Sequence, residues 1–430
     1  MTCRVRPAAV VFLVVALIAA ACTDEAEPAG PEVFTPATGN QTDLTDPSTT
    51  LIPPRPEDPP EIEGPTLADF EVPCGRDAQP PAGRGIGLDD ELIRIGSGND
   101  RGARHAGSGG AGMPDAVAAM ADHCTALGGL AGRGLQVLTY DAAVVEVADR
   151  AGEQCAEVLA LVGAGYATPV AGLETWEGCG LPVFEGWPSW LLGVDPLPTE
   201  AHRFAAFAEP AAMQVGIVAP SSLEGRALAE ALGGVLTAQG FTVTIDRAYS
   251  LTTETDWADV AAELVAAGVG LVHVDGPCED VTAPLLSALA AVESMPLVVA
   301  GPSSYDQACL DTARLAGAPV ERLLVQVPFL PLEDGAAAPV TQAFADILAT
   351  YAAEVTGDTL LAAAAFWSFA DAVDACADDL TRACLRSNLD GDGAGLVRRD
   401  DAACRVVLGV VDGVFERVVP QTPGRLACSP

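Results

Sequence analysis

The chain has 430 residues, of which 50% are hydrophobic and 19% charged, so it can bury a large core and is not a disordered protein. It carries 59 acidic and 22 basic residues, so its net charge is −37, and every basic residue is Arg. Phosphate binding needs a basic face, so this charge argues against nucleic acid as a partner. At roughly 150 residues per domain, the chain beyond its first 66 residues predicts two lobes.

The first 21 residues have the pattern of an export signal. Two arginines precede an apolar run from Ala8 to Ala21, which is too short to span a bilayer comfortably as a permanent helix. The run ends in small residues directly before Cys22, as in a bacterial lipobox, although Ala19 stands where Leu is usual. We therefore expect cleavage before Cys22 and attachment of acyl chains to it, which places the protein on the extracytoplasmic side of the cell membrane. A plain cleaved signal peptide is the alternative.

Residues 22–66 are predicted to be an extended, disordered tether. From residue 23 onward this stretch holds ten prolines, ten acidic residues and a single base, Arg55. Such a composition cannot bury enough apolar surface to offset the entropy of ordering. As a flexible coil it separates its ends by roughly 40 Å, enough to hold a folded domain clear of a membrane.

The twelve cysteines indicate an oxidising compartment. No CxxC pair occurs and the four His are scattered, so neither a zinc site nor a redox motif is indicated, and we expect no metal or cofactor. Sequence alone leaves the disulfide connectivity open. Pairing of neighbours gives one hypothesis: Cys155 with Cys179, Cys278 with Cys309, Cys376 with Cys384, and Cys404 with Cys428.

After Leu88 short apolar, β-rich runs alternate with Gly- or Pro-containing turns and Ala-rich helical stretches. Runs that are apolar on both faces are typical of parallel strands buried between helix layers, so we predict an α/β fold with doubly wound parallel sheets. The candidate strands are residues 92–96, 135–140, 158–163 and 182–184, and then 214–219, 242–245, 270–274, 297–300 and 323–327.

A long helical stretch from Pro339 to Leu389 interrupts this rhythm. A hairpin follows, with Asp412-Gly413 as a type I′ turn between the β-rich runs 406–411 and 414–418. Together these features predict two Rossmann-like lobes joined by a hinge with several crossings. The expected boundaries are residues 67–205 and 331–403 for lobe 1, 206–330 for lobe 2, and 404–430 for a hairpin packed on lobe 2 or the hinge.

This order of elements resembles the type I periplasmic binding proteins, in particular the branched-chain amino-acid group of transporter substrate-binding proteins. The resemblance covers about residues 90–420. Its most specific motif is the Gly-Gly turn in residues 127–133, which is followed by a strand ending in Tyr140-Asp141. Weaker matches are the opening strand Ile93–Gly96, Glu224-Gly225 at a helix start, and the helix start at residues 379–382.

The resemblance implies a protein that captures a small polar solute when its lobes close, usually for delivery to an ABC permease in the membrane. It also implies that ligand contacts come from loops after the strands, where sheets of this kind bind their ligands. The matching positions are Ser97, Asn99, Asp100, Tyr166, Thr168, Glu185 and Trp187 in lobe 1, and Ser222, Glu224, Asp275, Ser303 and Tyr305 in lobe 2.

Several of these positions depart from the family pattern. The residue after Gly301-Pro302 is Ser303, not an acidic residue, and Glu224 replaces a common aromatic. A leucine-like ligand is therefore doubtful, whereas Asp275, Glu224 and Glu185 suit a cationic or polyhydroxylated one. Each of these residues also has a purely structural interpretation. Asp275 would cap the next helix, Glu224 would be stabilised by the helix dipole in a first turn, and Trp187 would pack in the core.

Other functions find weaker support in the sequence. No GxGxxG is complete, because Arg101 and Thr168 stand where the third glycine is needed, and the loop around His105 and Ser108 lacks the first glycine of GxSxG. The acidic stretch that begins at Asn388 has Arg399 where a calcium loop needs Glu. We therefore expect a protein that is not an enzyme, with a secreted hydrolase as a remote alternative. The main alternative is a sensor or interaction lipoprotein that keeps the fold without transport.

Overall fold

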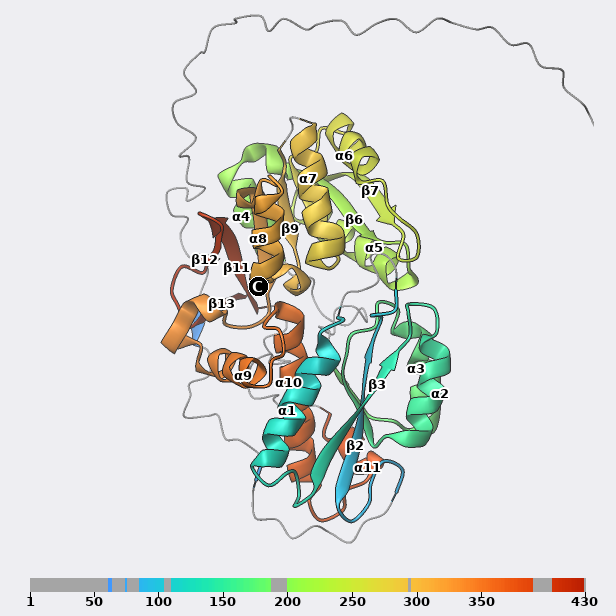
Figure 1. The fold of residues 1–430 in the computed structure, drawn as a ribbon. Coiled ribbons are helices and arrows are strands. Elements are labelled where there is room, and N and C mark those ends of the chain that lie inside the picture. The colour runs from blue at the N-terminus through green and yellow to red at the C-terminus, as the bar shows by residue number, and fades with distance from the viewer. Residues whose placement is uncertain are drawn as a thin grey trace, which may run out of the picture. The chain divides into compact units, whose positions relative to one another are not determined.

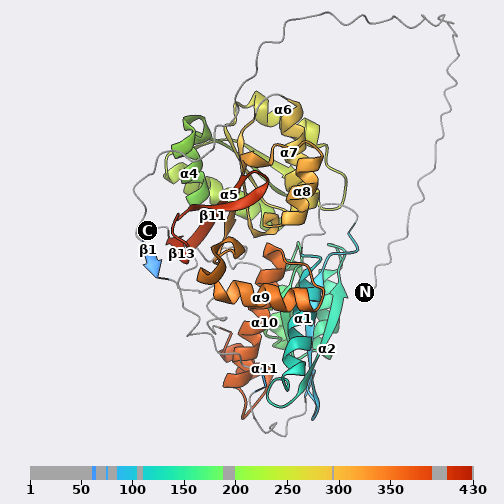
Figure 2. The same ribbon diagram turned by 60° about the vertical axis from the view of Figure 1, so that its left-hand side comes forward.

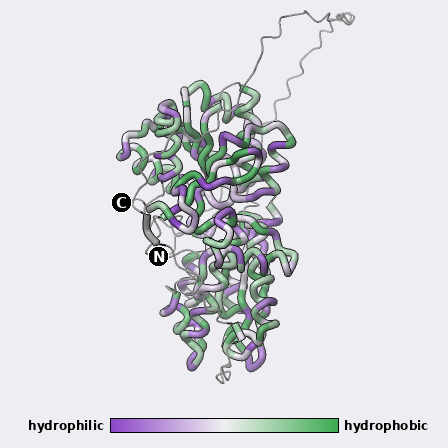
Figure 3. The backbone as a smooth tube through the Cα atoms, turned by 90° about the vertical axis from the view of Figure 1, so that its left-hand side faces the viewer, coloured by the Kyte–Doolittle hydropathy of each residue, from purple (hydrophilic) through white to green (hydrophobic). Residues whose placement is uncertain are grey.

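The computed structural model describes residues 61–63, 74–75, 85–103, 110–186, 199–292, 295–389 and 404–428. Two parallel βα arrays occupy these residues, and we call the part around the first sheet lobe 1 and the part around the second lobe 2 (Figure 1). Within these ranges no helix has the length and apolar character needed to cross a membrane. Along the backbone, hydrophobic and hydrophilic stretches alternate over short distances (Figure 3).

Lobe 1 contains a four-stranded parallel sheet in the order β3-β2-β4-β5. Its strands are β2 (Leu92–Asn99), β3 (Gly134–Asp141), β4 (Ala160–Ala164) and β5 (Val183–Glu185). Its helices are α1 (Met113–Ala126), α2 (Val147–Glu157) and α3 (Val170–Cys179). One face packs against α1, and the other buries an apolar cluster that includes Val158, Leu161 and Trp176 beneath α2 and α3.

The second sheet has nine strands in the order β1-β13-β11-β10-β9-β8-β6-β7, with β12 paired to β11. Its parallel strands are β6 (Gln214–Pro220), β7 (Thr242–Tyr249), β8 (Leu271–Val274), β9 (Leu297–Ala300) and β10 (Leu323–Val327). Its antiparallel strands are β1 (Glu61–Glu63), β11 (Cys404–Val411), β12 (Val414–Val419) and β13 (Arg425–Cys428). The predicted parallel strands are therefore present in lobe 2, and the antiparallel strands extend the same sheet beyond β10.

Helices cover both faces of the parallel part of lobe 2. One face buries side chains of α4 (Glu200–Ala208) and α5 (Leu223–Ala238). The other packs against α6 (Trp257–Ala266), α7 (Ala283–Ala291) and α8 (Gln307–Leu315). This double cover explains why the central strands are apolar on both sides.

The predicted helical stretch forms α9 (Pro339–Thr350), α10 (Gly357–Ala375) and α11 (Arg382–Ser387). Helix α10 packs against α1, β4 and β5 of lobe 1, although lobe 2 precedes it in the chain (Figure 2). Nearly every side of α10 is buried, as expected for a helix that is apolar all round. The chain therefore crosses from lobe 2 back to lobe 1 and then again to β11, the neighbour of β10.

Every strand predicted from the sequence is present, with ends displaced by up to four residues. The hairpin turn is also confirmed, because Asp412 and Gly413 both have positive φ, 52° and 83°, as a type I′ turn requires. The short strands β1 and β13 were missed, and the predicted tether is wrong at its end, because Glu61–Glu63 pairs with β13 in the sheet of lobe 2.

Three of the hypothesised disulfides are confirmed: Cys155–Cys179, Cys278–Cys309 and Cys376–Cys384. A further bond joins Cys74 to Cys124, which the neighbour pairing left unassigned. Cys404 is also disulfide-bonded, and its backbone lies opposite that of Cys428 in the β11–β13 ladder. The side chain of Cys428 lies outside the described part of the chain.

Candidate functional site

In each lobe the polar candidates follow the carboxyl ends of parallel strands. Asp100 comes directly after β2 and Asp275 directly after β8, while Ser303 follows β9. Parallel strands end at one edge of a sheet, so each group is gathered at a single edge.

Asp100 is fully buried and fastens two loops of lobe 1. Its Oδ1 accepts a hydrogen bond from the Val144 amide and its Oδ2 one from the Ala167 amide, both at 2.6 Å. Burial raises the pKa of the carboxyl group to about 6, and the two amides only partly offset this effect. Both carboxylate oxygens are therefore already hydrogen-bonded to the loops that surround the site.

Ser97 and Asn99 lie on β2 and are also buried. The Ser97 hydroxyl donates to the Gly163 carbonyl at 3.2 Å, and the Asn99 side-chain oxygen accepts from the Arg101 amide at 2.8 Å. Both contacts hold the backbone at the end of the sheet.

Tyr166 and Thr168 lie in the loop between β4 and α3. The Tyr166 hydroxyl accepts from Gln154 at 2.7 Å, and its ring stacks on Trp176 with a centroid distance of 6.2 Å. Thr168 donates its hydroxyl to the Val144 carbonyl at 2.9 Å. The loop that carries these two candidate residues is thus tied to lobe 1 by its own side chains.

In lobe 2, Ser222 is the N-cap of α5 and accepts from the Gly225 amide at 3.0 Å. Tyr305 is buried against Phe329 and Phe415, and its hydroxyl donates to the Glu333 carboxylate at 2.7 Å. Burial raises the pKa values of both Tyr305 and Glu333. The hydroxyl also accepts from the Leu332 amide at 3.0 Å, so Tyr305 contributes packing and two hydrogen bonds rather than an open aromatic face.

Asp275 does not cap the following helix, so the competing structural interpretation of this residue is wrong. That helix, Cys278–Thr282, has Pro277 at its N-cap position and no side-chain cap. Asp275 is partly buried, and Tyr249 donates its hydroxyl to the Asp275 main-chain carbonyl at 2.8 Å. Burial, with the nearby carboxylate of Asp358, raises the pKa of Asp275 to about 6.

Asp358, the second residue of α10, is a site residue that the sequence analysis missed. Its Oδ1 accepts from the Ser303 hydroxyl at 2.8 Å, and it also accepts a hydrogen bond from the Gly110 amide of lobe 1. Burial raises its pKa to about 6. In the sequence, the capping box Thr356-x-x-Thr359 marks the start of this helix. It was the signal from which a polar residue at this helix start could have been predicted.

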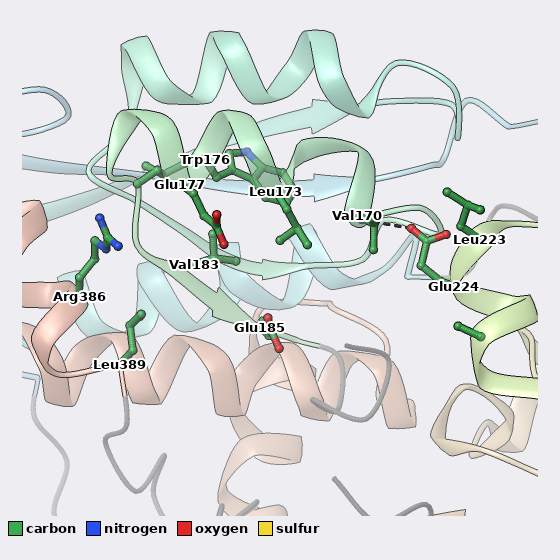
Figure 4. A pocket seen from close by; sticks show the side chains of 12 residues that line it. Val170, Leu173, Trp176, Glu177, Val183, Glu185, Leu223, Glu224, Arg386 and Leu389 are labelled. Carbon is green, nitrogen blue, oxygen red and sulfur yellow. Dashed lines mark hydrogen bonds between the residues drawn. The ribbon is translucent and has the colours of Figure 1, made fainter. Parts of the chain in front are cut away.

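Glu224 makes a contact between the lobes. It lies in the first turn of α5, as expected, and only 7% of it is exposed. Its Oε1 accepts from the Val170 amide, the first residue of α3, at 3.1 Å (Figure 4).

Around this contact lies an open pocket of about 600 Å³ between α3, β5, α11 and the start of α5 (Figure 4). Its walls are mainly apolar, and its polar side chains include Glu185 and Glu224. The lining residues are Val170, Leu173, Trp176, Glu177, Leu181, Val183, Glu185, Leu223, Glu224, Ala227, Arg386 and Leu389. A size of this order and an apolar wall with few polar groups are typical of small-molecule sites.

The described residues contain no group of three or more His, Cys, Asp or Glu side chains placed to hold a metal ion. Trp187 lies outside the described residues, as do His105, Ser108 and the part of the acidic stretch after Leu389.

A family model described as "Periplasmic binding protein" matches residues 93–397. No protein with a curated description matches the chain significantly. The family match spans the sheet of lobe 1, the parallel strands of lobe 2 and the return through α10, and it ends before β11.

Solved structures share the fold at low sequence identity. A fatty acid ABC transporter substrate-binding protein from Thermomonospora curvata superposes with a TM-score of 0.64 at 15% identity, covering 78% of this chain and 93% of that one. A branched-chain amino acid transporter substrate-binding protein from Streptococcus pneumoniae, in complex with isoleucine, gives 0.58 at 14%, covering 76% and 98%. A putative branched-chain amino acid ABC transporter protein from Rhodospirillum rubrum gives 0.51 at 20%, covering 76% and 99%.

Proposed function

This chain belongs to the periplasmic binding protein family, and from that premise we propose that it captures a small polar solute between its two lobes for an ABC uptake system. The observation that carries this proposal is the position of Asp358. Asp358 lies on α10, where the chain has crossed from lobe 2 back to lobe 1. It accepts hydrogen bonds from Ser303 of lobe 2 and from the Gly110 amide of lobe 1. These two contacts support a polar site between the segments that follow β2 and β9.

The chemistry at that point favours a ligand with a cationic or hydrogen-bond-donating group. Asp275 and Asp358 bring two carboxyl groups together, and burial disfavours their charged forms. A bound ammonium or a set of hydroxyl groups offsets that cost, because it supplies further hydrogen-bond donors to the two carboxyl groups. Of the twelve positions predicted from the sequence, we retain Asp275, Ser303 and Glu185 as the first candidates for ligand contact.

The test is a thermal-shift screen of the full-length chain, purified in detergent, against amino acids, sugars, amides and polyamines. A ligand at 100 times its Kd stabilises the folded state by about 2.7 kcal/mol through mass action. The stabilising compound should lose its effect in Asp275→Asn and keep it in Asp346→Asn, which alters an exposed carboxylate on α9. If no compound in these classes stabilises the chain, the capture proposal is wrong.

We further propose that Cys22 carries the lipid anchor and that residues 22–60, which precede β1, tether the lobes to the extracytoplasmic face of the cell membrane. The support is the apolar run before Cys22 and the Pro-rich, acidic composition after it. Cys22→Ser should abolish labelling by a clickable fatty acid and move the chain from the membrane to the soluble fraction. Labelling that persists in this variant would rule out Cys22 as the acceptor.

A transport-independent sensor or interaction lipoprotein is the second candidate. It is favoured by the internal contacts of Asp100 and Glu224, because these carboxylates already bind backbone amides of the chain. Permease and ATPase genes beside the gene for this chain would favour uptake, and their absence would favour sensing.

A further inference from the structure

The contact between Glu224 and Val170 joins residues 54 positions apart in the sequence and belonging to different lobes. Glu224 stands at the start of α5, after β6, whereas Val170 is the first residue of α3, after β4. Lobe 2 therefore places a carboxylate at the N-terminus of a helix in lobe 1.

The local structure explains why a carboxylate is stabilised there. The first amides of a helix have no partner within the helix, and the dipole gives this end a partial positive charge. The N-cap residue of α3 is Pro169, which makes no side-chain hydrogen bond to the helix. Glu224 thus supplies from lobe 2 the cap that lobe 1 lacks.

A second carboxylate, from lobe 1 itself, accepts a hydrogen bond from the loop that precedes α3. Asp100 accepts from the Ala167 amide at 2.6 Å, three residues before Val170. Asp100 stays with lobe 1 when the lobes move, because it also holds the Val144 amide of that lobe. Of these two carboxylates, Glu224 is the one whose contact must break when the lobes separate.

We propose that Glu224 is an interlobe latch, which holds the lobes together at α3 in the absence of ligand. The latch goes beyond solute capture, since it sets the balance between open and closed lobes before any ligand binds. A hydrogen bond to a charged group at a largely buried position favours the closed state by about tenfold or more. The contact buries the Glu224 side chain to 7% exposure, so water competes weakly for it.

The latch is tested by measuring the distance between the lobes in the ligand-free, full-length chain. Spin labels on p-acetylphenylalanine at the exposed positions Asp149 of α2 and Glu230 of α5 leave the disulfides intact. In Glu224→Ala the population at the longer distance should rise about tenfold relative to the parent. Glu224→Gln keeps the shape and one acceptor oxygen, so its shift should be smaller.

The matched control is Glu177→Ala, which removes another carboxylate from the same pocket. It should leave the distance distribution unchanged, because Glu177 lies at the other end of α3. Hydrogen exchange gives a second readout: the Val170 amide should exchange faster in Glu224→Ala and at the parental rate in Glu177→Ala.

Two results would overturn the latch: parental distances and parental Val170 exchange in Glu224→Ala, or equal opening in Glu177→Ala. If Glu224→Ala does not fold, Glu224→Gln decides by the same criteria. Because the measurement needs no ligand, its outcome is independent of the solute-capture proposal.

Discussion

The imidazole rings of His202 and His273 stack with their centroids 5.1 Å apart and their planes at 22°. His202 lies on α4 and His273 on β8, so the pair forms part of the contact between a helix and the centre of the sheet in lobe 2. Both side chains are at least nine-tenths buried. Burial lowers the pKa of His273 to about 4 and that of His202 well below its ordinary value.

We expect this pair to make lobe 2 sensitive to acid. Between pH 6.5 and 4 the unfolded chain binds protons at both His while the folded chain does not. Their contribution to stability therefore decreases as the pH is lowered through this range. Replacing both with apolar residues, as in His202→Leu with His273→Leu, should reduce the loss of stability over that range by about 3 kcal/mol or more. Urea unfolding at pH 7 and pH 4.5 checks this, and identical pH dependence in the parent and the double variant would contradict it.

Asp275→Asn should stabilise the fold and weaken ligand binding. The folded-state pKa of about 6 lies above the ordinary 3.8, so the charged carboxylate costs free energy at pH values above 6. The neutral amide removes about 1–3 kcal/mol of that cost at pH 8, and the gain should vanish below pH 4, where the parent residue is protonated in both states. Chemical denaturation at the two pH values measures the difference, and a destabilised variant at pH 8 would refute this account.

The disulfides should differ in their contributions to stability. Cys278–Cys309 closes a separation of 31 residues and Cys376–Cys384 one of 8. If constraint of the unfolded chain dominates, removing the first pair with alanines costs about 3–4 kcal/mol and removing the second about 2–3 kcal/mol. Guanidinium unfolding of the two double variants gives the order, and the reverse order would show that native-state effects dominate instead.

Arg417 and Asp334 form an ion pair whose side chains are only 6% and 1% exposed. Arg417 also donates to the carbonyls of Pro420 and Arg425, so it ties β12 to the start of β13. Arg417→Leu leaves a buried carboxylate without its cation and should cost about 3–5 kcal/mol. Arg94→Leu removes the exposed pair with Asp89, 37% and 40% exposed, and should cost less than about 1 kcal/mol. Equal costs in equilibrium unfolding would contradict this distinction.

The sequence alone determined most of the elements and their order. Runs such as Val215–Val218 are apolar on both faces and short, which is a local property of a strand between helix layers. The Asp412-Gly413 turn was likewise predictable, because few residues suit a type I′ turn. The disulfide connectivity was not, although three pairs of the neighbour hypothesis are confirmed. The family resemblance rested on the same local patterns.

Tertiary structure alone decided which side chains meet between the lobes. Asp358 lies on α10 and reaches Ser303, 55 residues earlier, and Glu224 reaches Val170 across the lobe boundary. It also decided that Asp275 leaves the next helix uncapped and that β1 and β13 extend the sheet of lobe 2. Hydrophobic periodicity reports which face of an element is buried and not which distant element covers it, so contacts of this range emerge only when the whole chain is packed.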